Sequence, residues 1–416
     1  MYDVCIIGGG ASGMACAITA ARRGLSCIIV EKEAKLGRKI YASGNGKCNV
    51  TNHNYDNRFD AYYNSSCNDY NMFLQKLFKN EHPDKEIIDF LFSIGIVTYD
   101  SDSYVYPRSL QASSVMWAFT DMIKNLGIKV LLKTCVDDIN HTDEGYIINT
   151  DSETISAKNV VLACGGAGYK SLGGSFKGYE TAKKLGILCT ELRPSLCGLV
   201  TKEDLSGISG VRIKAKAVLT EKDYPEKHIG CEEGEIQFTD YGISGIMIFN
   251  LSGKVGQMLS EGRKALINID FLPDLEDSMI IELFKNNNRK PKAILNSIIN
   301  DKLAGYIIDI ISTNINNSCD ELSDELINGL IYKLHNFNLE ITAVKDFDGA
   351  QVTAGGINLD ELNPEDMSVI NHEGLYAIGE MTDIDGICGG YNLTYAFISG
   401  IRAGEGIYDK TKSDKT

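Results

Sequence analysis

The first 31 residues alternate between apolar runs and stretches of small or polar residues. Residues 4–7 form a short, largely β-branched apolar run, which is typical of a strand buried on both faces. Residues 11–21 are rich in alanine and other small residues, and this predicts a helix. Residues 27–30 form a second apolar run. The pattern therefore predicts a strand, a helix and a second strand, with a glycine-rich turn after the first strand.

The glycines of that turn have a spacing with a chemical purpose. Gly8, Gly10 and Gly13 follow the G-x-G-x-x-G pattern, in which the glycines permit a tight turn, close approach of a pyrophosphate, and close packing of helix on strand. The helix N-terminus favours the negative charge of the phosphates. Glu31 ends the second strand, where a carboxylate can accept hydrogen bonds from a ribose. These features predict a dinucleotide-binding unit.

Further strands and helices continue this first domain. Apolar spacing predicts helices at 70–96 and 111–126. A strand expected at 159–163 runs into a second glycine-rich turn and a helix. No adjoining strand ends in an acidic residue at the sequence spacing where a carboxylate could bind the ribose of a dinucleotide. Independent nicotinamide binding is therefore not expected there.

The pattern changes near residue 191. Strict alternation at 210–219 and 265–271 predicts antiparallel strands with one solvated face. Helical spacing follows, and buried strand patterns return later, before a glycine loop that opens a final helix. We therefore expect an α/β nucleotide-binding domain in two pieces around an insertion. The expected boundaries are 1–190, 191–274 for an antiparallel β subdomain, 275–340 for a helical subdomain, and 341–416.

Composition narrows the choice of partners. The 416 residues carry 41 Lys and Arg against 56 Asp and Glu, a formal charge of −15, and no basic cluster stands out. We therefore expect a small-molecule substrate, and neither nucleic acid nor an anionic membrane as a main partner. The sequence enters its first strand at once and contains no apolar run of about 20 residues, which favours a cytoplasmic protein.

The cysteine pattern predicts neither a disulfide framework nor a metal site. The twelve cysteines include no C-x-x-C pair, and several lie in apolar runs, among them Cys5, Cys16 and Cys27. This usage is typical of reduced thiols that serve as small hydrophobic side chains.

Residues 35–52 are dense in glycine, amide, hydroxyl and basic side chains and lack periodicity. This predicts a loop. A solvated surface loop is one interpretation, but such loops rarely gather so many polar side chains directly after a nucleotide-binding unit. We favour a loop that contacts a flavin.

Four motifs resemble those of one family. They are GRKIYASGNGKCNVTN at 37–52, GEIQFTDYGISG at 234–245, VTAGGI at 352–357 and GGYN at 389–392. They look like motifs of bacterial and archaeal flavoproteins usually named as aminoacetone-oxidase-like or bile-acid Δ4,6-reductase-like, within the two-dinucleotide-binding-domain flavoproteins. The resemblance covers essentially the whole chain. It implies a Rossmann-like FAD-binding domain with an inserted β-barrel-like subdomain and a helical subdomain.

The resemblance also implies which residues contact FAD. The pyrophosphate would lie on the glycines of the first turn, and the adenosine ribose on Glu31. Many members of the superfamily have Asp where this chain has Glu380, so a longer or water-bridged ribityl contact is expected there. The candidate cofactor-binding residues are Gly8, Gly10, Ala11, Ser12, Gly13, Glu31, Lys32, Arg38, Lys39, Ser43, Gly44, Asn45, Gly46, Lys47, Cys48, Val136, Cys164, Gly165, Gly166, Gly379, Glu380, Gly390, Tyr391, Asn392 and Leu393.

The resemblance further implies a flavin oxidoreductase. We expect hydride to pass from NAD(P)H through flavin N5 to a C=C bond of a hydrophobic, enone-like substrate of the steroid or bile-acid kind. A general acid must deliver the proton, and Tyr241, Tyr391 and Arg38 are the candidates. An amine oxidase that uses oxygen and a non-catalytic, redox-responsive flavoprotein are open alternatives. The net charge argues against a flavoenzyme that modifies RNA.

Overall fold

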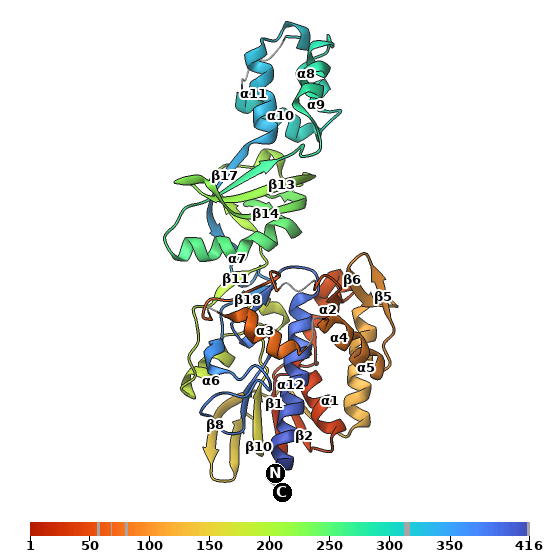
Figure 1. The fold of residues 1–416 in the computed structure, drawn as a ribbon, viewed down its shortest axis with the longest axis vertical. Helices are drawn as coiled ribbons and strands as arrows, with labels where there is room; N and C mark the ends of the chain where they lie inside the picture. The colour runs from red at the N-terminus through yellow and green to blue at the C-terminus, as the bar shows by residue number, and fades with distance from the viewer. Residues whose placement is uncertain (56–58, 68, 80–81, 312–316, 414–416) are drawn as a thin grey trace. The chain divides into compact units, whose positions relative to one another are not determined.

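The chain divides into two compact units in a computed structural model, which describes residues 1–55, 59–67, 69–79, 82–311 and 317–413 (Figure 1). The first unit comprises Met1–Leu192 and Val352–Thr416, and the second comprises Arg193–Gln351. The sequence pattern placed the return to the first domain at residue 341. The structure places it later, because a strand of the second unit, β17 (Phe337–Val344), follows the inserted helices.

A mainly parallel sheet forms the centre of the first unit. Residues 4–6 of its strand β1 (Tyr2–Ile7) have no exposed surface, as expected of an inner strand. Because the parallel strands point the same way, their carboxyl ends meet at one edge of the sheet. These parallel strands are β7 (Lys129–Leu132), β2 (Cys27–Glu31), β1 (Tyr2–Ile7), β10 (Thr154–Leu162) and β19 (Leu375–Ala377), and the antiparallel strands β9 (Gly145–Thr150) and β8 (Val136–Thr142) extend the sheet beyond β10.

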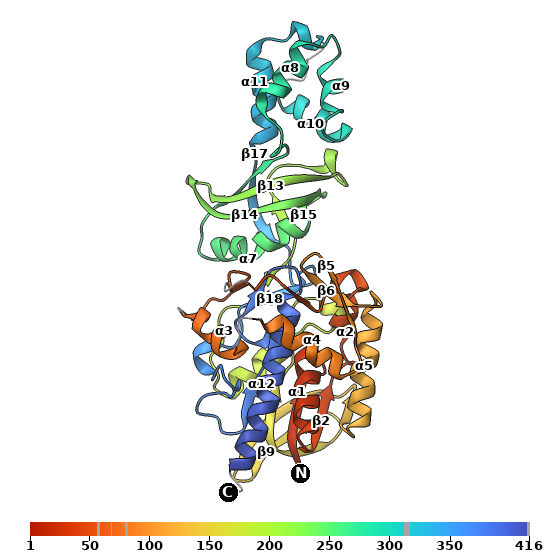
Figure 2. The ribbon, with the colours of Figure 1, turned by 45° about the vertical axis from the view of Figure 1, so that its right-hand side comes forward.

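Two helices that are far apart in sequence, α1 (Ala11–Arg22) and α12 (Tyr391–Ser413), lie side by side in the first unit (Figures 1 and 2). Their backbones approach closely. A Cβ atom on Gly400 would lie 2.3 Å from the Ser12 carbonyl oxygen, and one on Gly404 would lie 2.8 Å from that of Cys16. The small residues of α1 therefore have a packing purpose, since larger side chains would push the helices apart.

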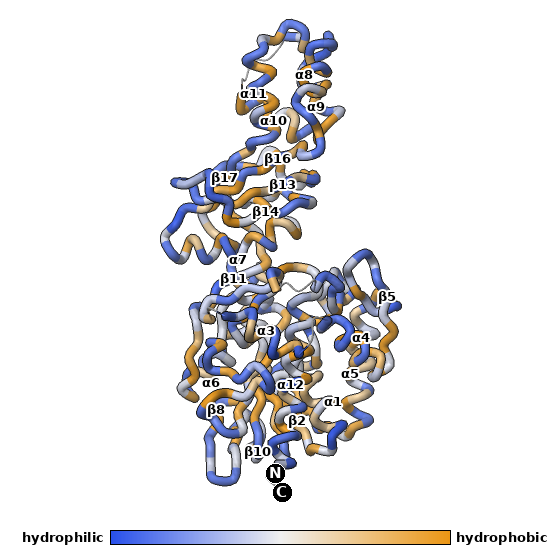
Figure 3. Tube along the Cα trace, in the orientation of Figure 1, coloured by the Kyte–Doolittle hydropathy of each residue, from blue (hydrophilic) through white to orange (hydrophobic). Residues whose placement is uncertain are grey.

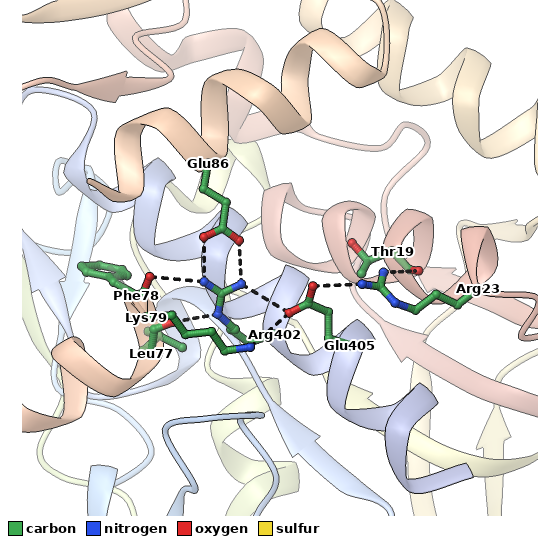
Figure 4. A network of polar contacts seen from close by, with 8 residues as sticks. All are labelled: Thr19, Arg23, Leu77, Phe78, Lys79, Glu86, Arg402 and Glu405. Carbon is green, nitrogen blue, oxygen red and sulfur yellow. Dashed lines mark hydrogen bonds and ion pairs between the residues drawn. The ribbon is translucent and has the colours of Figure 1, made fainter. Parts of the chain in front are cut away.

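A buried arginine fixes α12 against two other helices (Figure 4). The Arg402 side chain is 3% exposed and forms two hydrogen bonds with the Glu86 carboxylate, at 2.6 and 2.7 Å. It also donates to the carbonyl oxygens of Leu77, at 2.8 Å, and Phe78, at 3.3 Å. Its guanidinium therefore ties α12 to α4 (Pro83–Ser93), which carries Glu86, and to the end of α3 (Tyr70–Phe78).

The predicted loop at 35–52 contains short helical turns, so the loop prediction was wrong in part. Helix α2 covers Arg38–Ala42 and a 3₁₀ turn covers Ser43–Gly46. Only Ile40 of α2 is buried, and five residues are too few to show helical periodicity. The first unit is completed by α5 (Ala112–Asn125), α6 (Lys177–Lys184), β3 (Thr51–Asn52), β4 (Tyr62–Tyr63), β5 (Thr98–Ser101), β6 (Tyr104–Pro107), β18 (Val352–Ala354) and β20 (Asp385–Gly386).

The second unit contains a closed barrel, which confirms the inserted β-barrel-like subdomain. Burial alternates along β16 (Ala265–Asp270), where Ala265, Ile267 and Ile269 face the core. Orange and blue also alternate along the helices of this unit, as expected of amphipathic helices (Figure 3). The barrel strands are β12 (Leu199–Thr201), β15 (Gly242–Ser244), β14 (Tyr224–Phe238), β13 (Arg212–Glu221), β16 (Ala265–Asp270) and β17, and the unit also contains β11 (Arg193–Ser195), α7 (Ile246–Ser260), α8 (Asp277–Lys285), α9 (Pro291–Leu295), α10 (Asp301–Ile311) and α11 (Asp324–His335).

The cysteines are all free, and burial raises the pKa of the Cys5 thiol to about 12. Within the described ranges, no group of three or more His, Cys, Asp or Glu side chains could hold a metal ion. None of the helices described has the length and apolar character needed to cross a membrane.

Candidate active site

The opening loop, residues 8–13, runs from the carboxyl end of β1 into α1, and its three motif glycines, Gly8, Gly10 and Gly13, have different surroundings. A Cβ atom on Gly8, whose φ is +112°, would lie 2.2 Å from the Ala163 carbonyl oxygen. One on Gly13 would lie 2.0 Å from the Gly8 carbonyl oxygen. A Cβ atom on Gly10 would meet no atom within 4 Å. Gly8 and Gly13 therefore permit close packing, whereas Gly10 leaves open space beside the start of α1.

A carboxylate at the end of β2 lies against this loop. Glu31 accepts a hydrogen bond from the Gly9 amide, at 2.7 Å, and one from the Glu33 amide, at 2.8 Å. Each carboxylate oxygen has further acceptor capacity, so these bonds orient Glu31 without preventing it from binding a ribose. Lys32 follows directly after β2.

Helix α2 begins beside the opening loop and carries two candidate cations. The Gly37 amide, at its N-terminus, donates to the Gly9 carbonyl at 2.9 Å. Arg38 forms an ion pair with Glu33 and donates to the Ser171 carbonyl at 2.8 Å, so protein groups hold its guanidinium. A side chain engaged in this way is a poor candidate for the proton donor.

The second cation, Lys39, pairs with Glu380. Its ammonium lies 2.9 Å from one carboxylate oxygen, and the other oxygen accepts a hydrogen bond from the Thr353 amide at 3.1 Å. A Cβ atom on Gly166 would lie 2.2 Å from that oxygen. Glu380 lies beside Gly379, where a Cβ atom would lie 2.5 Å from the Ser12 hydroxyl oxygen. The longer glutamate thus reaches two partners near the start of α1, and Gly166 makes room for it.

Thr353 was not among the candidates, although it lies in the VTAGGI motif. Its side chain is fully buried, and its hydroxyl oxygen accepts hydrogen bonds from the amides of Ala167, at 2.9 Å, and Gly168, at 3.1 Å. Those amides follow the second glycine turn. Thr353 therefore connects the segment after β10 to Glu380.

The turn at residues 43–49 has strained backbone. Gly44, Asn45 and Cys48 have φ values of 55°, 53° and 61°, and left-handed conformations are uncommon for residues other than glycine. Such strain clusters at binding sites. Ser43 donates to the Ile40 carbonyl at 2.7 Å, and Gly44 through Lys47 are exposed. Burial raises the pKa of the Cys48 thiol to about 11.

Asn49, the next residue, was also not among the candidates. Its side chain is 8% exposed, and its Oδ1 atom is buried with no hydrogen-bond partner among the described residues. An unpaired buried acceptor costs about 1–3 kcal/mol. A ligand donor would relieve that cost. Sequence could indicate a polar loop here but not which amide oxygen would be buried and unpaired.

The other candidates after β10 have simpler surroundings. The Cys164 amide donates to the Met381 sulfur at 3.1 Å. A Cβ atom on Gly165, whose φ is +71°, would meet no atom within 4 Å. Val136, at the start of β8, is buried. Gly165 therefore offers open backbone at the same sheet edge as Gly10.

The late loop, residues 386–392, leads into α12. Asn392 donates to the Gly386 carbonyl at 2.7 Å and accepts from the Gly386 amide at 2.9 Å, so its side chain closes the loop on itself. Leu393 is partly buried in the core of the first unit. A Cβ atom on Gly390 would lie 2.8 Å from the Thr51 carbonyl oxygen. The Asn392 amide is thus engaged within the loop itself.

Tyr391 belongs to a buried aromatic cluster. Its ring centroid lies 5.4 Å from that of Tyr55 and 5.9 Å from that of Tyr62. Its hydroxyl donates to the Asn54 carbonyl at 3.4 Å, and burial raises its pKa to about 12. Such a hydroxyl keeps its proton at neutral pH, and the residue is only 6% exposed.

Tyr241 belongs to the second unit. The Lys345 ammonium lies 4.6 Å from the centroid of its ring, within the range of a cation–π interaction. A Cβ atom on Gly198 would lie 2.7 Å from the Tyr241 hydroxyl oxygen, so that glycine makes room for the tyrosine. These contacts fix the ring within its own unit.

A family model described as "HI0933-like protein Rossmann domain" matches residues 2–406. The chain belongs to the HI0933-like family. The recognition of an FAD-binding Rossmann family from the four motifs is thereby confirmed. This HI0933-like protein is an FAD-dependent oxidoreductase.

Two relatives that match nearly the whole HI0933-like chain have different names. The "3-dehydro-bile acid delta(4,6)-reductase" of Clostridium scindens is 34% identical over 414 residues, which cover 97% of this chain and 98% of the relative. The "ribosomal RNA dihydrouridine synthase" of Escherichia coli is 26% identical over 419 residues, or 96% of each chain. A structure of 3-ketosteroid delta1-dehydrogenase from Sterolibacterium denitrificans matches with a TM-score of 0.50 and 12% identity, over 98% of this chain and 99% of the other. That structural likeness concerns the fold alone.

Proposed function

We propose that this HI0933-like protein is a reductase that saturates a C=C bond conjugated with a carbonyl in a hydrophobic, steroid- or bile-acid-like substrate, with NAD(P)H as the electron donor. The relative that is 34% identical over nearly its whole length, the bile-acid reductase, supports this reaction class. The formal charge of −15 supports a substrate that is not a polyanion.

The observation that carries the proposal is the open space at Gly10. It lies where the first turn meets α1, and the flanking glycines are packed while Gly10 is not. Backbone amides and the helix dipole favour a pyrophosphate at such a point. Gly165 adds open backbone at the same edge, and Asn49 adds an unpaired acceptor. These residues fit FAD.

We assign the chain's own groups as follows. The opening loop would bind the pyrophosphate, with Lys39 supplying positive charge and Glu380 holding that ammonium in place. Glu31 would hold the adenosine ribose. Bound FAD would supply the hydride-transfer chemistry that side chains lack. Of the candidates for the proton donor, Arg38 is paired and Tyr391 is buried with a raised pKa, which disfavours both, and Tyr241 stays a prediction from the sequence.

A second candidate, reduction of uridine in RNA, is favoured by relatives named ribosomal RNA dihydrouridine synthase. Saturating the uracil ring is also addition of two hydrogens to a C=C bond conjugated with a carbonyl. The two candidates therefore share a reaction and differ in substrate. Lower identity, 26% against 34%, and the acidic composition place RNA second.

Anaerobic stopped-flow absorbance of the FAD-loaded protein tests the proposal. The protein is mixed with NADH or NADPH and then with a 3-oxo-4,6-diene steroid, a uridine-containing RNA or a primary amine. Fast bleaching by the nicotinamide and recolouring by the steroid would support the proposal. Recolouring by RNA alone would identify RNA, in place of a steroid, as the substrate. Bleaching by an amine without nicotinamide, with recolouring by oxygen, or flavin that stays yellow throughout, would overturn it.

A further inference from the structure

A side chain of β3, Asn52, forms a hydrogen bond with the backbone of the late loop. The Asn52 amide nitrogen donates to the Gly389 carbonyl at 3.0 Å. Its Oδ1 atom accepts from the Asn54 amide at 2.9 Å. The residue is 2% exposed, so both ends of its amide are engaged in a nearly dry environment. Asn52 therefore has one well-defined orientation. It lies in the motif at 37–52 but is not among the candidate cofactor-binding residues.

Thr51, the neighbouring residue of β3, contacts the residues that follow Gly389. The Thr51 hydroxyl lies 2.7 Å from the Thr394 hydroxyl, in the first turn of α12. Gly390 has a φ of +94° and packs directly on the Thr51 backbone. At the other end of the loop, Asn392 holds Gly386 by two hydrogen bonds. The peptide that joins Gly389 to Gly390 is therefore clamped on both sides.

The bond from Asn52 determines where the Gly390 N–H points. A trans peptide is planar, and its C=O and N–H groups point in opposite directions. Because Asn52 holds the Gly389 carbonyl, the Gly390 N–H must point away from β3. Gly389 and Gly390 both have positive φ, at 125° and 94°, and glycines offer little resistance to a rotation of this peptide.

We propose that Asn52 is a positioning residue: by holding the Gly389 carbonyl it aims the Gly390 N–H, directly before α12, at the flavin and so favours negative charge on the reduced cofactor. The proposal rests on the FAD site proposed above. Donors at a helix N-terminus stabilise an anion only when they face it. Loss of the Asn52 bond would let the peptide rotate and present a carbonyl oxygen in place of the N–H.

The test compares Asn52→Asp and Asn52→Ala with the wild type. Asn52→Asp keeps the shape but places a carboxylate oxygen against the Gly389 carbonyl, and Asn52→Ala removes the donor without adding charge. Three quantities are measured for each protein: FAD affinity, the midpoint potential of bound FAD, and the melting temperature. Asn125→Asp is the matched control, because it adds the same charge at an exposed position at the end of α5.

Relative to the wild type, we expect the ratio of the affinity for reduced FAD to that for oxidised FAD to fall at least tenfold in both Asn52 variants. For a two-electron couple, tenfold corresponds to about 30 mV lower potential. The Asn125→Asp control should keep the wild-type potential. A lower melting temperature with an unchanged potential would assign Asn52 a purely structural role and overturn the proposal. If Asn52→Asp does not fold, Asn52→Ala decides by the same criterion.

Failure of the FAD site itself would be distinguishable. Wild-type protein that takes up no FAD would overturn the proposed function and this inference together. Wild-type protein that binds FAD, with Asn52 variants of unchanged affinity and potential, would overturn only the role of Asn52.

Discussion

The opening loop and the late loop both lead into long helices of the first unit, yet different interactions shape them. The opening loop is shaped by backbone packing, since Gly8 and Gly13 lie where any Cβ atom would strike a main-chain oxygen. The late loop is shaped by two side-chain amides, one from Asn392 within it and one from Asn52, 337 residues from its partner. The first shape thus depends on contacts with main-chain atoms, of Gly8 nearby and of Ala163 far along the chain, and the second depends on side-chain hydrogen bonds.

Of the substitutions that distinguish the two loops, Gly10→Val in the opening loop is expected to have the largest effect. Gly10 has a φ of −79° and a ψ of −170°, an extended conformation that valine adopts readily, and its Cβ would enter open space. The side chain would occupy the volume proposed for the pyrophosphate. We expect FAD affinity to fall at least a hundredfold, about 3 kcal/mol, with the melting temperature of the FAD-free protein unchanged.

Flavin absorbance after dialysis against known FAD concentrations measures this affinity. Gly10→Ala, with a smaller side chain, should lose less. A valine variant that retains the full flavin content would remove the pyrophosphate from the opening loop.

Arg402→Ala tests how strongly the late loop depends on the position of α12. The substitution leaves the Glu86 carboxylate and two backbone carbonyls without their donor. Breaking a buried ion pair costs about 3–5 kcal/mol, and the lower end applies here because the Glu86 side chain is 25% exposed. Urea unfolding measures the change. Arg23→Ala is the control, because its pair with Glu405 is partly exposed and should contribute less than about 1 kcal/mol.

The comparison of loops also explains which features could be predicted from sequence. The strand, glycine turn and helix at the N-terminus follow from neighbouring residues, and so does the alternation along β16. Helix α2 escaped prediction because five residues are too few to carry a periodic signal. The return to the first unit was placed too early because β17 completes a barrel whose other strands lie before the helices.

The candidate site was harder to predict wherever a side chain has a distant partner. The residues around Glu380 could not indicate that its carboxylate reaches Lys39, which lies 341 residues away in sequence. Nor could it indicate that Asn392 turns back onto Gly386. Spacing along the chain identifies the residues near a ligand, but the direction of each side chain is decided by packing that only the fold supplies.

Gly13→Ala tests the claim that backbone packing shapes the opening loop. Alanine favours a helix over glycine by about 1 kcal/mol, but the added Cβ would lie 2.0 Å from the Gly8 carbonyl oxygen, which cannot move without distorting the turn. We expect net destabilisation of about 1–3 kcal/mol by urea unfolding. Gly329→Ala, in α11, is the matched control, because nothing lies within 4 Å of its added Cβ. It should stabilise the protein slightly; equal effects of both substitutions would contradict the packing argument.

The smallest expected effect concerns the support of the late loop by β3, and it depends on pH. His53 follows β3 and contacts Asp84 at 2.7 Å and Asp100 at 3.3 Å. Partial burial disfavours its charge, but the hydrogen bonds and charges of the two carboxylates outweigh burial, so the pKa of His53 lies above its ordinary value of 6.5. Its contribution to stability is therefore complete below that ordinary value and is lost as the pH rises through the raised one.

The free energy of unfolding of the wild type and of His53→Asn is measured in urea at pH 6 and at pH 8. We expect it to fall further in the wild type than in the variant as the pH rises. The difference between the two falls should be less than about 1 kcal/mol, because the His53 side chain is 35% exposed. Comparison with the variant separates the contribution of His53 from the pH dependence that both proteins share. Identical pH dependence would show that the His53 ion pairs do not stabilise β3. A larger drop in the variant than in the wild type would reverse the sign of the argument, since His53 would then be less basic in the folded protein than in the unfolded chain.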